Sequence, residues 1–527
     1  MKGKNKNKEN KSKNSITIDY ENKRLSVYYF IPLLLIAGFV PLIVHGKYID
    51  LSGTTQALYW TGQQQYLDFF SYWKSRWIIA LTAIALIIYI SLCKQKKLPF
   101  KNLKQYYIPL GIYAIFVIIS TFTAIDTQTA LWGFVDMYQG MFVLLSYVII
   151  TFLTINFVNN ERDVNLFVNA FLFMMIVEGI IGVGQYFGFD FFQSKLGQSL
   201  IVPANVKVEN LSFSFGPKTI YGTLFNTNFV GSFATLMLPL SVAFLLGANS
   251  KTQRIVSGIS VMLMFFTWIG CNSRAGYLGV AVSAVVALWL FRKVIKKYLV
   301  GFVGFFVIFA VILLGLNNFS EGRMFDRLKV FDVKKQIENL KIKDDRFAII
   351  EDIFIKDYNV TILTDKDKLN LKIDGEKLFF LDEDKQELTI ETKNNIITIN
   401  NDRYKRYKIT IPENYPGFTL IIEELWRNRD INFYITSEGI KVLGSGGRIV
   451  DPIVAERFKP LDGLEGFMSG RGYIWSRTIP MLSTYIVKGS GSDNYPIAFP
   501  QNDFVAKLRM GSDASLVIDK PHNMYLQ

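Results

Sequence analysis

Long apolar runs dominate the first three-fifths of this 527-residue chain. Each run is roughly twenty residues long, the length that an α-helix needs to cross the hydrocarbon core of a bilayer. Half of all residues are hydrophobic and only 19% are charged, which is too apolar for an ordinary soluble protein. Barrel strands would instead be about ten residues of alternating polarity. The sequence predicts a polytopic α-helical membrane protein and excludes a secreted, cytosolic or disordered one.

About nine membrane helices are expected, and together they form a transmembrane domain over residues 26–316. A Lys/Asn-rich segment, 1–25, precedes them and is expected to be a disordered cytoplasmic tail. No small-residue cleavage site follows the first apolar run, so this run is interpreted as a membrane helix and not as a signal peptide. The expected spans are 26–45, 77–93, 106–124, 138–158, 165–188, 227–248, 255–272, 275–291 and 298–316.

The distribution of basic residues predicts the orientation of these helices. With the tail placed inside, the cytoplasmic segments carry 20 Lys and Arg residues, whereas the short outward loops carry 7. Cytoplasmic loops of membrane proteins are enriched in Lys and Arg, which supports an inside N-terminus. Nine crossings then place residues 317–527 on the extracytoplasmic side.

Residues 317–527 are expected to form a large extracytoplasmic loop domain. They hold 31 basic and 32 acidic residues, so the net charge of +14 belongs to the membrane part. The basic balance is therefore topological, and no nucleic-acid partner is expected. Alternating apolar residues and Asp-Gly or Asn-Asn turns between about 359 and 442 predict an inserted antiparallel β module. The segment of about 465–527 follows this module.

Covalent or metal cross-links are not expected in the loop domain. The two cysteines, Cys93 and Cys271, are far apart and lie in apolar segments, so no disulfide framework is predicted. A single histidine and no cluster of His, Cys and Asp at ligand spacing leave little from which to build a zinc site. Neither a metal nor a cofactor is expected.

Three residues are candidates for chemistry on grounds of charge and position. Arg274 lies between two short-linked spans, followed by small residues that permit close packing around a buried group, although it could also be an interfacial arginine reaching the headgroups. His522 is a potential general base, with a purely structural role as the alternative. Arg471 is flanked by glycines before an expected helix and could bind an anion there or be merely solvated. Glu178, inside the fifth span, is costly in lipid and has no assigned role.

Four motifs together resemble the O-antigen ligase and polymerase superfamily of membrane glycan transferases. They appear in order, and the resemblance covers roughly 106–527 with the β module outside it. The motifs are Ser273-Arg274-Ala275-Gly276, Ser469-Gly470-Arg471-Gly472-Tyr473-Ile474-Trp475, Gly489-Ser490-Gly491-Ser492-Asp493-Asn494 and Pro521-His522-Asn523-Met524-Tyr525-Leu526-Gln527.

The resemblance implies a glycosyltransferase in the bacterial cytoplasmic membrane. It would transfer a glycan from a polyprenyl-diphosphate carrier to an acceptor hydroxyl on a glycan, lipid or protein, in cell-surface polysaccharide or glycoconjugate assembly. His522 matches the histidine that is proposed to activate the acceptor. Arg274 matches an arginine that holds the donor diphosphate, with Lys218 and Arg471 as further candidates for that role and with membrane lipid as a partner. Possible supporting residues are Asn523, Asp493, Tyr221 and Asn226.

The chain departs from the family pattern in the segment Gly222-Thr223-Leu224-Phe225-Asn226-Thr227-Asn228. Thr227 replaces a proline, and Thr219 stands where family members commonly carry an arginine. The neighbouring Lys218 could supply the charge, but a compact ammonium cannot grip two oxygens in a fixed fork. The donor site is thus expected to match only in part.

Several readings of function stay open at this point. Ligase, polymerase and protein O-oligosaccharyltransferase share one fold, and the sequence does not separate them. A non-catalytic glycan-binding protein or receptor is the rival from another class. A transporter is disfavoured because paired broken helices and buried carboxylates are missing from the spans. Family members continue into further membrane helices after the His-Asn-x-Tyr-Leu-Gln stretch, so the chain is expected to lack these C-terminal helices.

Overall fold

The computed structural model describes residues 25–290 and 348–526, except for short stretches and single residues. The left-out positions are 52, 54–63, 99, 205, 207–210, 214, 217, 376, 414–415, 424–427, 511–514 and 524–525, and only isolated residues are described between 291 and 347. Residues 1–24 of the expected cytoplasmic tail and most of the expected ninth span, 298–316, fall outside the described ranges.

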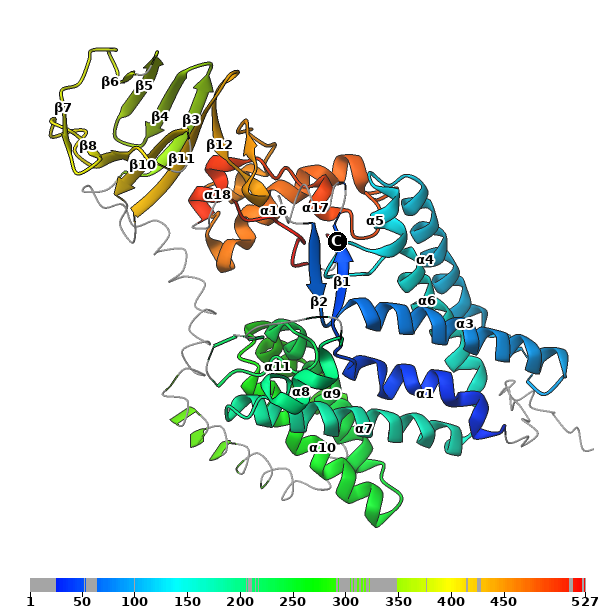
Figure 1. Cartoon of the computed structure of the whole chain (residues 1–527). Helices are drawn as coiled ribbons and strands as arrows, with labels where there is room; N and C mark the ends of the chain where they lie inside the picture. The colour runs from blue at the N-terminus through cyan, green and yellow to red at the C-terminus, as the bar shows by residue number, and fades with distance from the viewer. Residues whose placement is uncertain are drawn as a thin grey trace, which may run out of the picture.

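Apolar helices form the larger part of the molecule, as expected for a membrane protein (Figure 1). Five are long and apolar enough to cross a membrane: α3 (Tyr72–Lys94), α4 (Lys104–Phe122), α7 (Glu161–Tyr186), α9 (Thr227–Leu246) and α10 (Lys251–Gly270). Three apolar segments are shorter: α1 (Ile31–Gly38) with its flanking 3₁₀ turns, α6 (Met141–Phe157) and α11 (Arg274–Leu290). All eight coincide with expected spans, and five reach the length of a full crossing.

Local sequence sets where these helices begin. The side chains of Asn160, Asn226 and Ser250 accept backbone hydrogen bonds at the starts of α7, α9 and α10. Such N-cap residues satisfy N–H groups that have no partner inside the helix. Pro109 and Pro239 lie inside α4 and α9, and prolines are tolerated in membrane helices where neighbouring groups satisfy the freed carbonyl.

The helices pack in two groups. One contains α7, α9, α10 and α11, and the other contains α1, α3, α4 and α6, with α1 also packed against α7. Glycines allow α9 and α11 to approach closely, because a Cβ on Gly276 would lie 2.9 Å from the Cα of Gly231. The expectation that small residues after Arg274 permit close helix packing is thereby confirmed. The packing fixes the start of α11, where Arg274 lies.

The loops that connect successive helices lie at two opposite ends of the bundle. One end carries the strand pair β1 (Lys47–Asp50) and β2 (Gln65–Asp68), the short helix α5 (Thr127–Trp132) and the short helix α8 (Lys195–Ile201). We call this the capped end, because the segment 451–526 also packs there. Asp126 and Asn494 join the two across 368 positions of sequence: the Asp126 amide donates to Asn494 Oδ1 at 2.8 Å.

In the sequence, the residues between the membrane helices and the segment 451–526 form a separate region of two antiparallel sheets. Four strands from β3 (Ile350–Lys356) to β6 (Lys377–Leu381) make one sheet, and seven from β7 (Ile390–Lys393) to β13 (Ile449–Val450) make the other. The intervening strands are β4 (Asn359–Thr364), β5 (Lys368–Asp374), β8 (Ile396–Ile399), β9 (Tyr407–Thr410), β10 (Gly417–Glu423), β11 (Asn428–Thr436) and β12 (Gly439–Leu443).

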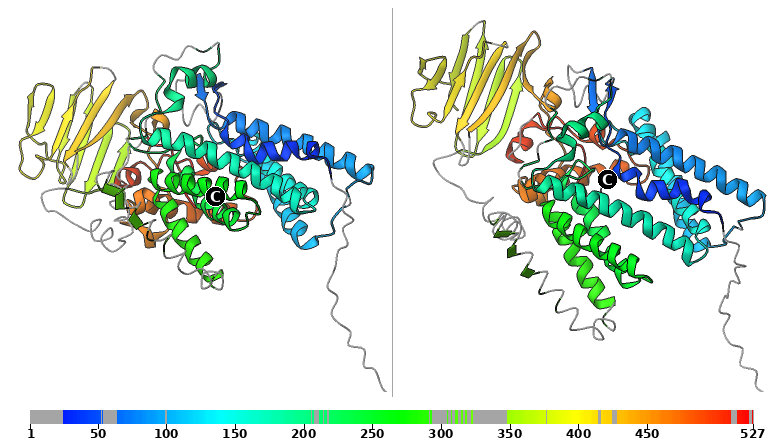
Figure 2. Two further views of the ribbon diagram at one scale, coloured as in Figure 1. Left: turned by 90° about the horizontal axis from the view of Figure 1, so that it is seen from below. Right: turned by 60° about the horizontal axis from the view of Figure 1, so that its bottom comes forward.

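The two sheets share one hydrophobic core, so the region is a β-sandwich (Figure 2). Its largest buried side chains include Phe380, Tyr407, Phe418 and Phe433. The core is also contacted from outside the sandwich, since Phe504 and Leu508 of α18 (Phe504–Met510) belong to it. In Figures 1 and 2 the sandwich projects away from the helices beyond the capped end.

The segment 451–526 has its own small core. It contains α16 (Phe467–Tyr485) and α17 (Tyr495–Ala498), which pack around Tyr473, Ile474, Tyr495 and Phe499. A buried ion pair, Arg477 Nε to Asp503 Oδ2 at 2.7 Å, links α16 to the start of α18. The segment is therefore a structured platform between the sandwich and the bundle.

Candidate functional site

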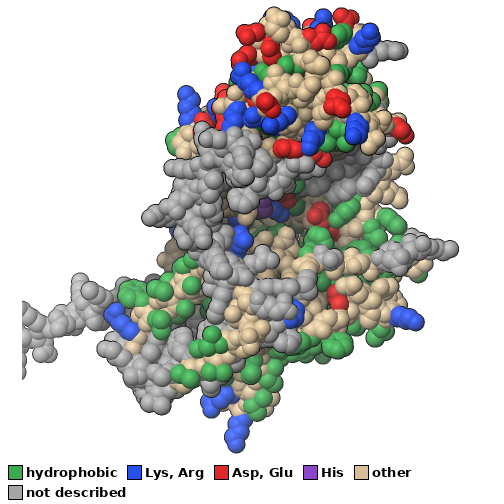
Figure 3. Space-filling view, turned by 90° about the vertical axis from the view of Figure 1, so that its left-hand side faces the viewer, with side chains coloured by type: hydrophobic (Ala, Val, Ile, Leu, Met, Phe, Trp, Pro, Cys, Tyr) green, Lys and Arg blue, Asp and Glu red, His purple; other side chains and the backbone are tan. Residues whose placement is uncertain are grey.

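The candidate residues from both halves of the chain meet at the capped end. Seen from the side, the charged surface of the sandwich and the apolar surface of the bundle are separated by a recess in which acidic, basic and histidine side chains are visible (Figure 3). Arg274 comes from the membrane helices, whereas Arg471 and His522 come from the platform. The sequence motifs thus lie in one region of the fold although they are up to about 250 positions apart in sequence.

Arg274 is the first residue of α11 and is fixed by contacts on both sides. Before it, Ser273 Oγ donates to Asn228 Oδ1 at 3.1 Å and accepts from the amide of Gly276 at 3.2 Å. The guanidinium itself crosses to the platform, where Nη1 donates to Ser469 Oγ at 3.3 Å. This contact joins the membrane helices directly to the start of α16.

The start of α16 has an unusual backbone. Met468, Ser469 and Gly470 have φ values of 50°, 62° and 87°, in the left-handed region that side chains other than glycine rarely adopt. The turn closes on itself, because Arg471 Nη1 donates to the carbonyl oxygen of Met468 at 3.1 Å. Strained backbone of this kind concentrates at binding and catalytic sites. Here it presents Ser469 to Arg274 and places Arg471 at the head of the helix.

His522 lies in a loop that the same helix holds. Trp475 Nε1 donates to the carbonyl oxygen of Pro521 at 2.9 Å, and His522 itself has a φ of 50°. Its side chain is exposed, yet desolvation by the surrounding protein lowers its pKa. The Asp519 carboxylate raises this pKa, while the positive charges of Arg471 and Lys520 lower it. The imidazole therefore stays neutral to a lower pH than a free histidine, and the neutral form is the one that can accept a proton.

Acidic residues lie close to the cations Arg471 and Lys520. Lys520 Nζ lies 3.1 Å from Asp519 Oδ2 and 5.1 Å from the ring centre of Phe229. Its charge also acts on Asp136 and Asp493, whose pKa values are raised mainly by burial, that of Asp493 to about 6. Asp493 accepts hydrogen bonds from the amides of Phe134 and Gln139, which explains its place in the motif. It therefore connects the platform to the α5–α6 loop.

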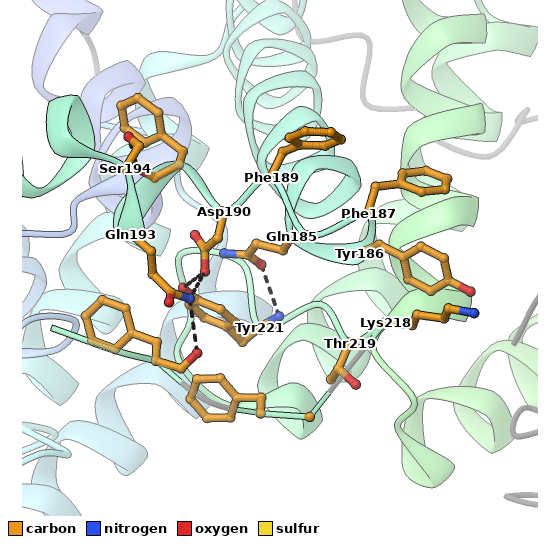
Figure 4. Close-up of a pocket in the computed structure, with 15 residues that line it drawn as sticks. Gln185, Tyr186, Phe187, Phe189, Asp190, Gln193, Ser194, Lys218, Thr219 and Tyr221 are labelled. Carbon is orange, nitrogen blue, oxygen red and sulfur yellow. Dashed lines mark hydrogen bonds between the residues drawn. The ribbon is translucent and has the colours of Figure 1, made fainter. Parts of the chain in front are cut away.

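Lys218 lines a separate pocket of about 880 Å³ at the end of α7 (Figure 4). Seven aromatic rings surround it: Tyr186, Phe187, Phe189, Phe191, Phe213, Phe215 and Tyr221. In Figure 4 the side chains of Asp190, Gln193 and Tyr221 point toward one another, and Lys218 extends away from them. The pocket is connected to Arg274 through Asn272, whose Nδ2 donates to the carbonyl oxygen of Lys218 at 3.1 Å.

Two of the four candidate supporting residues, Tyr221 and Asn226, have local roles. Tyr221 donates its hydroxyl to Asp190 Oδ2 at 2.5 Å within the aromatic pocket. Asn226 is the N-cap of α9, with its Oδ1 accepting from the amide of Asn228 at 2.8 Å. Asn523 is half-buried next to His522. Thr219, which stands where an arginine was expected, accepts a hydrogen bond from Asn272 Nδ2 at 3.2 Å.

Glu178 is a buried carboxylate inside α7, so the expectation that the spans lack buried carboxylates is wrong. Its carboxylate accepts hydrogen bonds from both the amide and the hydroxyl of Thr223, at 3.0 and 2.7 Å. Lys74, at the start of α3, donates to the carbonyl oxygen of Thr223, so that its charge faces Glu178. A Cβ on Gly222 would collide with Glu178 Oε1 at 1.8 Å, which explains the glycine there. The buried carboxylate thus holds the backbone at Gly222 and Thr223, shortly before the start of α9.

Two further acidic residues near the site were missed. Asp68 accepts hydrogen bonds from the amides of Ser71 and Tyr72 at the start of α3, and burial raises its pKa to about 6. Asp136 accepts a hydrogen bond from the Tyr66 hydroxyl at 3.2 Å. A carboxylate shortly before an apolar run is a helix-start signal that could have identified Asp68. Nothing in the sequence marks Asp136, because its neighbours come from β2 and the platform.

No group of three or more His, Cys, Asp and Glu residues that could hold a metal ion occurs in the described ranges. Comparison of the chain with protein-family models, with curated proteins and with solved structures gives no match. The geometry of the capped end is therefore the basis for assigning a function.

Proposed function

We propose that this protein is a membrane glycosyltransferase of the O-antigen ligase and polymerase type. It would transfer a glycan from a polyprenyl-diphosphate carrier to an acceptor hydroxyl at the extracytoplasmic face of the bacterial cytoplasmic membrane. The capped end would face outward, in keeping with the excess of 20 basic residues over 7 in the segments assigned to the opposite side.

One observation carries the proposal. The His522 imidazole lies close enough to Arg471 and Lys520 for their positive charges to lower its pKa, and it is held by the same helix whose first turn contacts Arg274. A base beside several fixed cations suits a reaction in which a hydroxyl loses its proton and an anionic leaving group departs. A binding protein that merely recognises a neutral glycan does not need this combination.

The donor would lie with its diphosphate against the cations. Arg274 and Arg471 both present planar guanidinium groups, which match pairs of phosphate oxygens better than an ammonium does. Lys218, in its aromatic pocket at the end of α7, supports a place for the apolar part of the donor or for the first sugar. Asn272, two residues before Arg274, donates hydrogen bonds to Lys218 and Thr219. These bonds fix the position of the pocket relative to Arg274.

The reaction would be a single displacement at the anomeric carbon. His522 accepts the proton of the acceptor hydroxyl, and the oxygen attacks the anomeric carbon as the bond from that carbon to the diphosphate oxygen breaks. Polyprenyl diphosphate leaves with the bonding electrons, and the new glycosidic bond has inverted configuration. The positive charges stabilise the diphosphate as its negative charge increases, which lowers the barrier.

The test is the variant His522→Ala in vesicles, with a polyprenyl-diphosphate oligosaccharide as donor and cell-envelope glycans as acceptor. Removal of a general base lowers such rates by about 10² to 10⁴. The matched control is His45→Ala, which removes the other histidine of the chain. Release of polyprenyl diphosphate should fall in the first variant and stay at the native level in the second.

The same assay separates the proposal from its rival. A glycan-binding protein or receptor would bind the donor and yet show no turnover in the native protein or in either variant. Equal turnover by the native protein and His522→Ala would contradict the role of His522 as base.

A further inference from the structure

An apolar patch lies on the platform where it meets α4. Ile486 and Val487, just after α16, are 72% and 75% exposed, and Phe122 at the last position of α4 is 83% exposed. Large apolar side chains with this exposure, grouped together, mark a surface that contacts something other than water. No described part of the chain covers them.

The patch is fixed at the level of the membrane helix. The turn after Val487 is docked on α4, because the amide of Gly491 donates to Ser120 Oγ at 3.2 Å and the Thr123 hydroxyl donates to the carbonyl oxygen of Lys488 at 3.5 Å. Ser120 lies two residues before the end of α4, which is about 3 Å along the helix axis. The platform therefore reaches down beside the last turn of a membrane helix.

Glycines in this turn make the close approach possible. A Cβ on Gly489 would lie 2.4 Å from Ser120 Oγ, and one on Gly491 would lie 2.5 Å from the Cβ of Ala124. Both have positive φ values, 69° and 102°. The turn cannot move away from the helix without losing these contacts. Ile486 and Val487 therefore keep a fixed position relative to the end of α4.

The surface next to the patch indicates that lipid covers it. Only 11% of the apolar window of α4 is buried inside the protein, so most of this helix faces outward. Its exposed residues include Ile108, Ile112, Ile115, Phe116 and Ile119. A helix of this composition is surrounded by lipid, and the patch continues its surface at the end of the span.

We propose that Ile486 and Val487 insert into the interface of the lipid bilayer and anchor α16 there. Apolar side chains of interfacial segments bury to a depth of about 5 to 10 Å, and the exposed Lys488 beside them can reach the headgroups. The anchor fixes the height of α16 above the membrane. It is independent of the proposed reaction.

The experiment measures the environment of a fluorescent label at position 487. Val487→Cys in the full chain is labelled with an environment-sensitive fluorophore and reconstituted in phosphatidylcholine vesicles with or without a quenching doxyl lipid. Unaltered protein supplies the background from Cys93 and Cys271. Ile115→Cys, in the middle of α4, marks the bilayer interior, and Ile390→Cys, on the outermost strand β7 of the sandwich, marks water.

Insertion predicts blue-shifted emission at 487 and stronger quenching by the doxyl lipid at 487 than at 390. Emission and quenching equal to those at 390 would overturn the proposal. A blue shift without lipid quenching would also overturn it, since protein and not lipid would then cover the patch. Thermal unfolding of each labelled variant verifies that it is folded.

Discussion

The indole Nε1 of Trp475 donates a hydrogen bond to the carbonyl oxygen of Pro521, at 2.9 Å, and Pro521 is directly followed by His522. Trp475 belongs to α16, and the His522 loop has no regular secondary structure of its own in the described residues. One hydrogen bond from a helix thus helps to determine where the imidazole stands. Small displacements of a catalytic group can cost large factors in rate.

Trp475→Phe should lower kcat by about 3- to 10-fold, since a typical hydrogen bond contributes about 1 kcal/mol and the ring volume is largely kept. The KM for the donor should stay unchanged, because no cation is lost. Steady-state kinetics with Trp289→Phe, an exposed residue of α11, as the control measure both constants. A changed KM with native kcat would contradict the positioning role.

The acid limb of the pH–rate profile should lie below 6.5, because desolvation lowers the pKa of His522 from its usual value. The base works as neutral imidazole, so activity is lost as the pH falls through this lowered pKa. Asp519→Asn should move the limb further down, since the Asp519 carboxylate raises the pKa. The profile of Asp374→Asn, at the exposed end of β5, should match the native one. An upward shift in Asp519→Asn would refute this electrostatic reading.

Arg274→Lys should weaken donor use although the charge is kept. Loss of one charge-assisted hydrogen bond costs about 1.5 to 3 kcal/mol, which is about 10- to 150-fold in kcat/KM. Arg254→Lys is the matched control, because Arg254 is exposed near the start of α10, at the opposite end of the bundle. Native kinetics for both variants would show that Arg274 is an interfacial anchor.

Thr219→Arg should lower the KM for the donor if Lys218 substitutes only in part for a bidentate cation. The change keeps the neighbouring Lys218 and loses the hydrogen bond from Asn272 to the threonine hydroxyl. Thr392→Arg, on the exposed strand β7, controls for the added positive charge. The measurement is the donor KM in vesicles, and an unchanged value would mean that another residue occupies this position.

Asn494→Ala should loosen the platform from the bundle. The fully buried amide joins both backbone groups of Asp126, and unsatisfied buried groups cost about 1 to 3 kcal/mol each. Hydrogen exchange should become faster in 120–126 and 488–494 and stay native in the sandwich. Asn400→Ala, at an exposed turn, should leave all three regions as they are. Uniformly faster exchange throughout would indicate general unfolding instead.

The membrane helices and the sheet region could be predicted because each produces a pattern in a short stretch of sequence. Runs of apolar residues identify helices that cross lipid, and alternation identifies strands. The ends were less accurate where the local rule breaks. The first expected span, 26–45, contains an α-helix only to Gly38, followed by a 3₁₀ turn that includes Pro41, since proline cannot donate to a continuing helix.

The sheet region likewise begins earlier than its pattern suggested. Strand β3 starts at Ile350, before the expected boundary of about 359, and a register shift between Ile350 and Asp352 interrupts its alternation. At the other end β13 has only two residues, too few to show a period. Bulges and very short strands remove the signal on which sequence reasoning depends.

The site itself depends on contacts that no local pattern contains. Glu178 was noted because a carboxylate in lipid is costly, but its partner Thr223 lies 45 positions away. Asp136 and Tyr66 are 70 positions apart. The roles of His522, Arg274, Arg471 and Lys218 stay predictions, to be decided by the kinetics above.

The sandwich and the platform share a hydrophobic boundary that affects how such proteins can be recombined. Phe504 and Leu508 of α18 complete the core of the sandwich, and Arg509 Nε donates to the carbonyl oxygen of Ile350 at 2.9 Å. Excision of 350–450 would therefore leave two large apolar side chains facing water on the remaining protein. Removal or exchange of the sandwich would therefore have to be accompanied by a change of Phe504 and Leu508 if these side chains are not to be exposed to water.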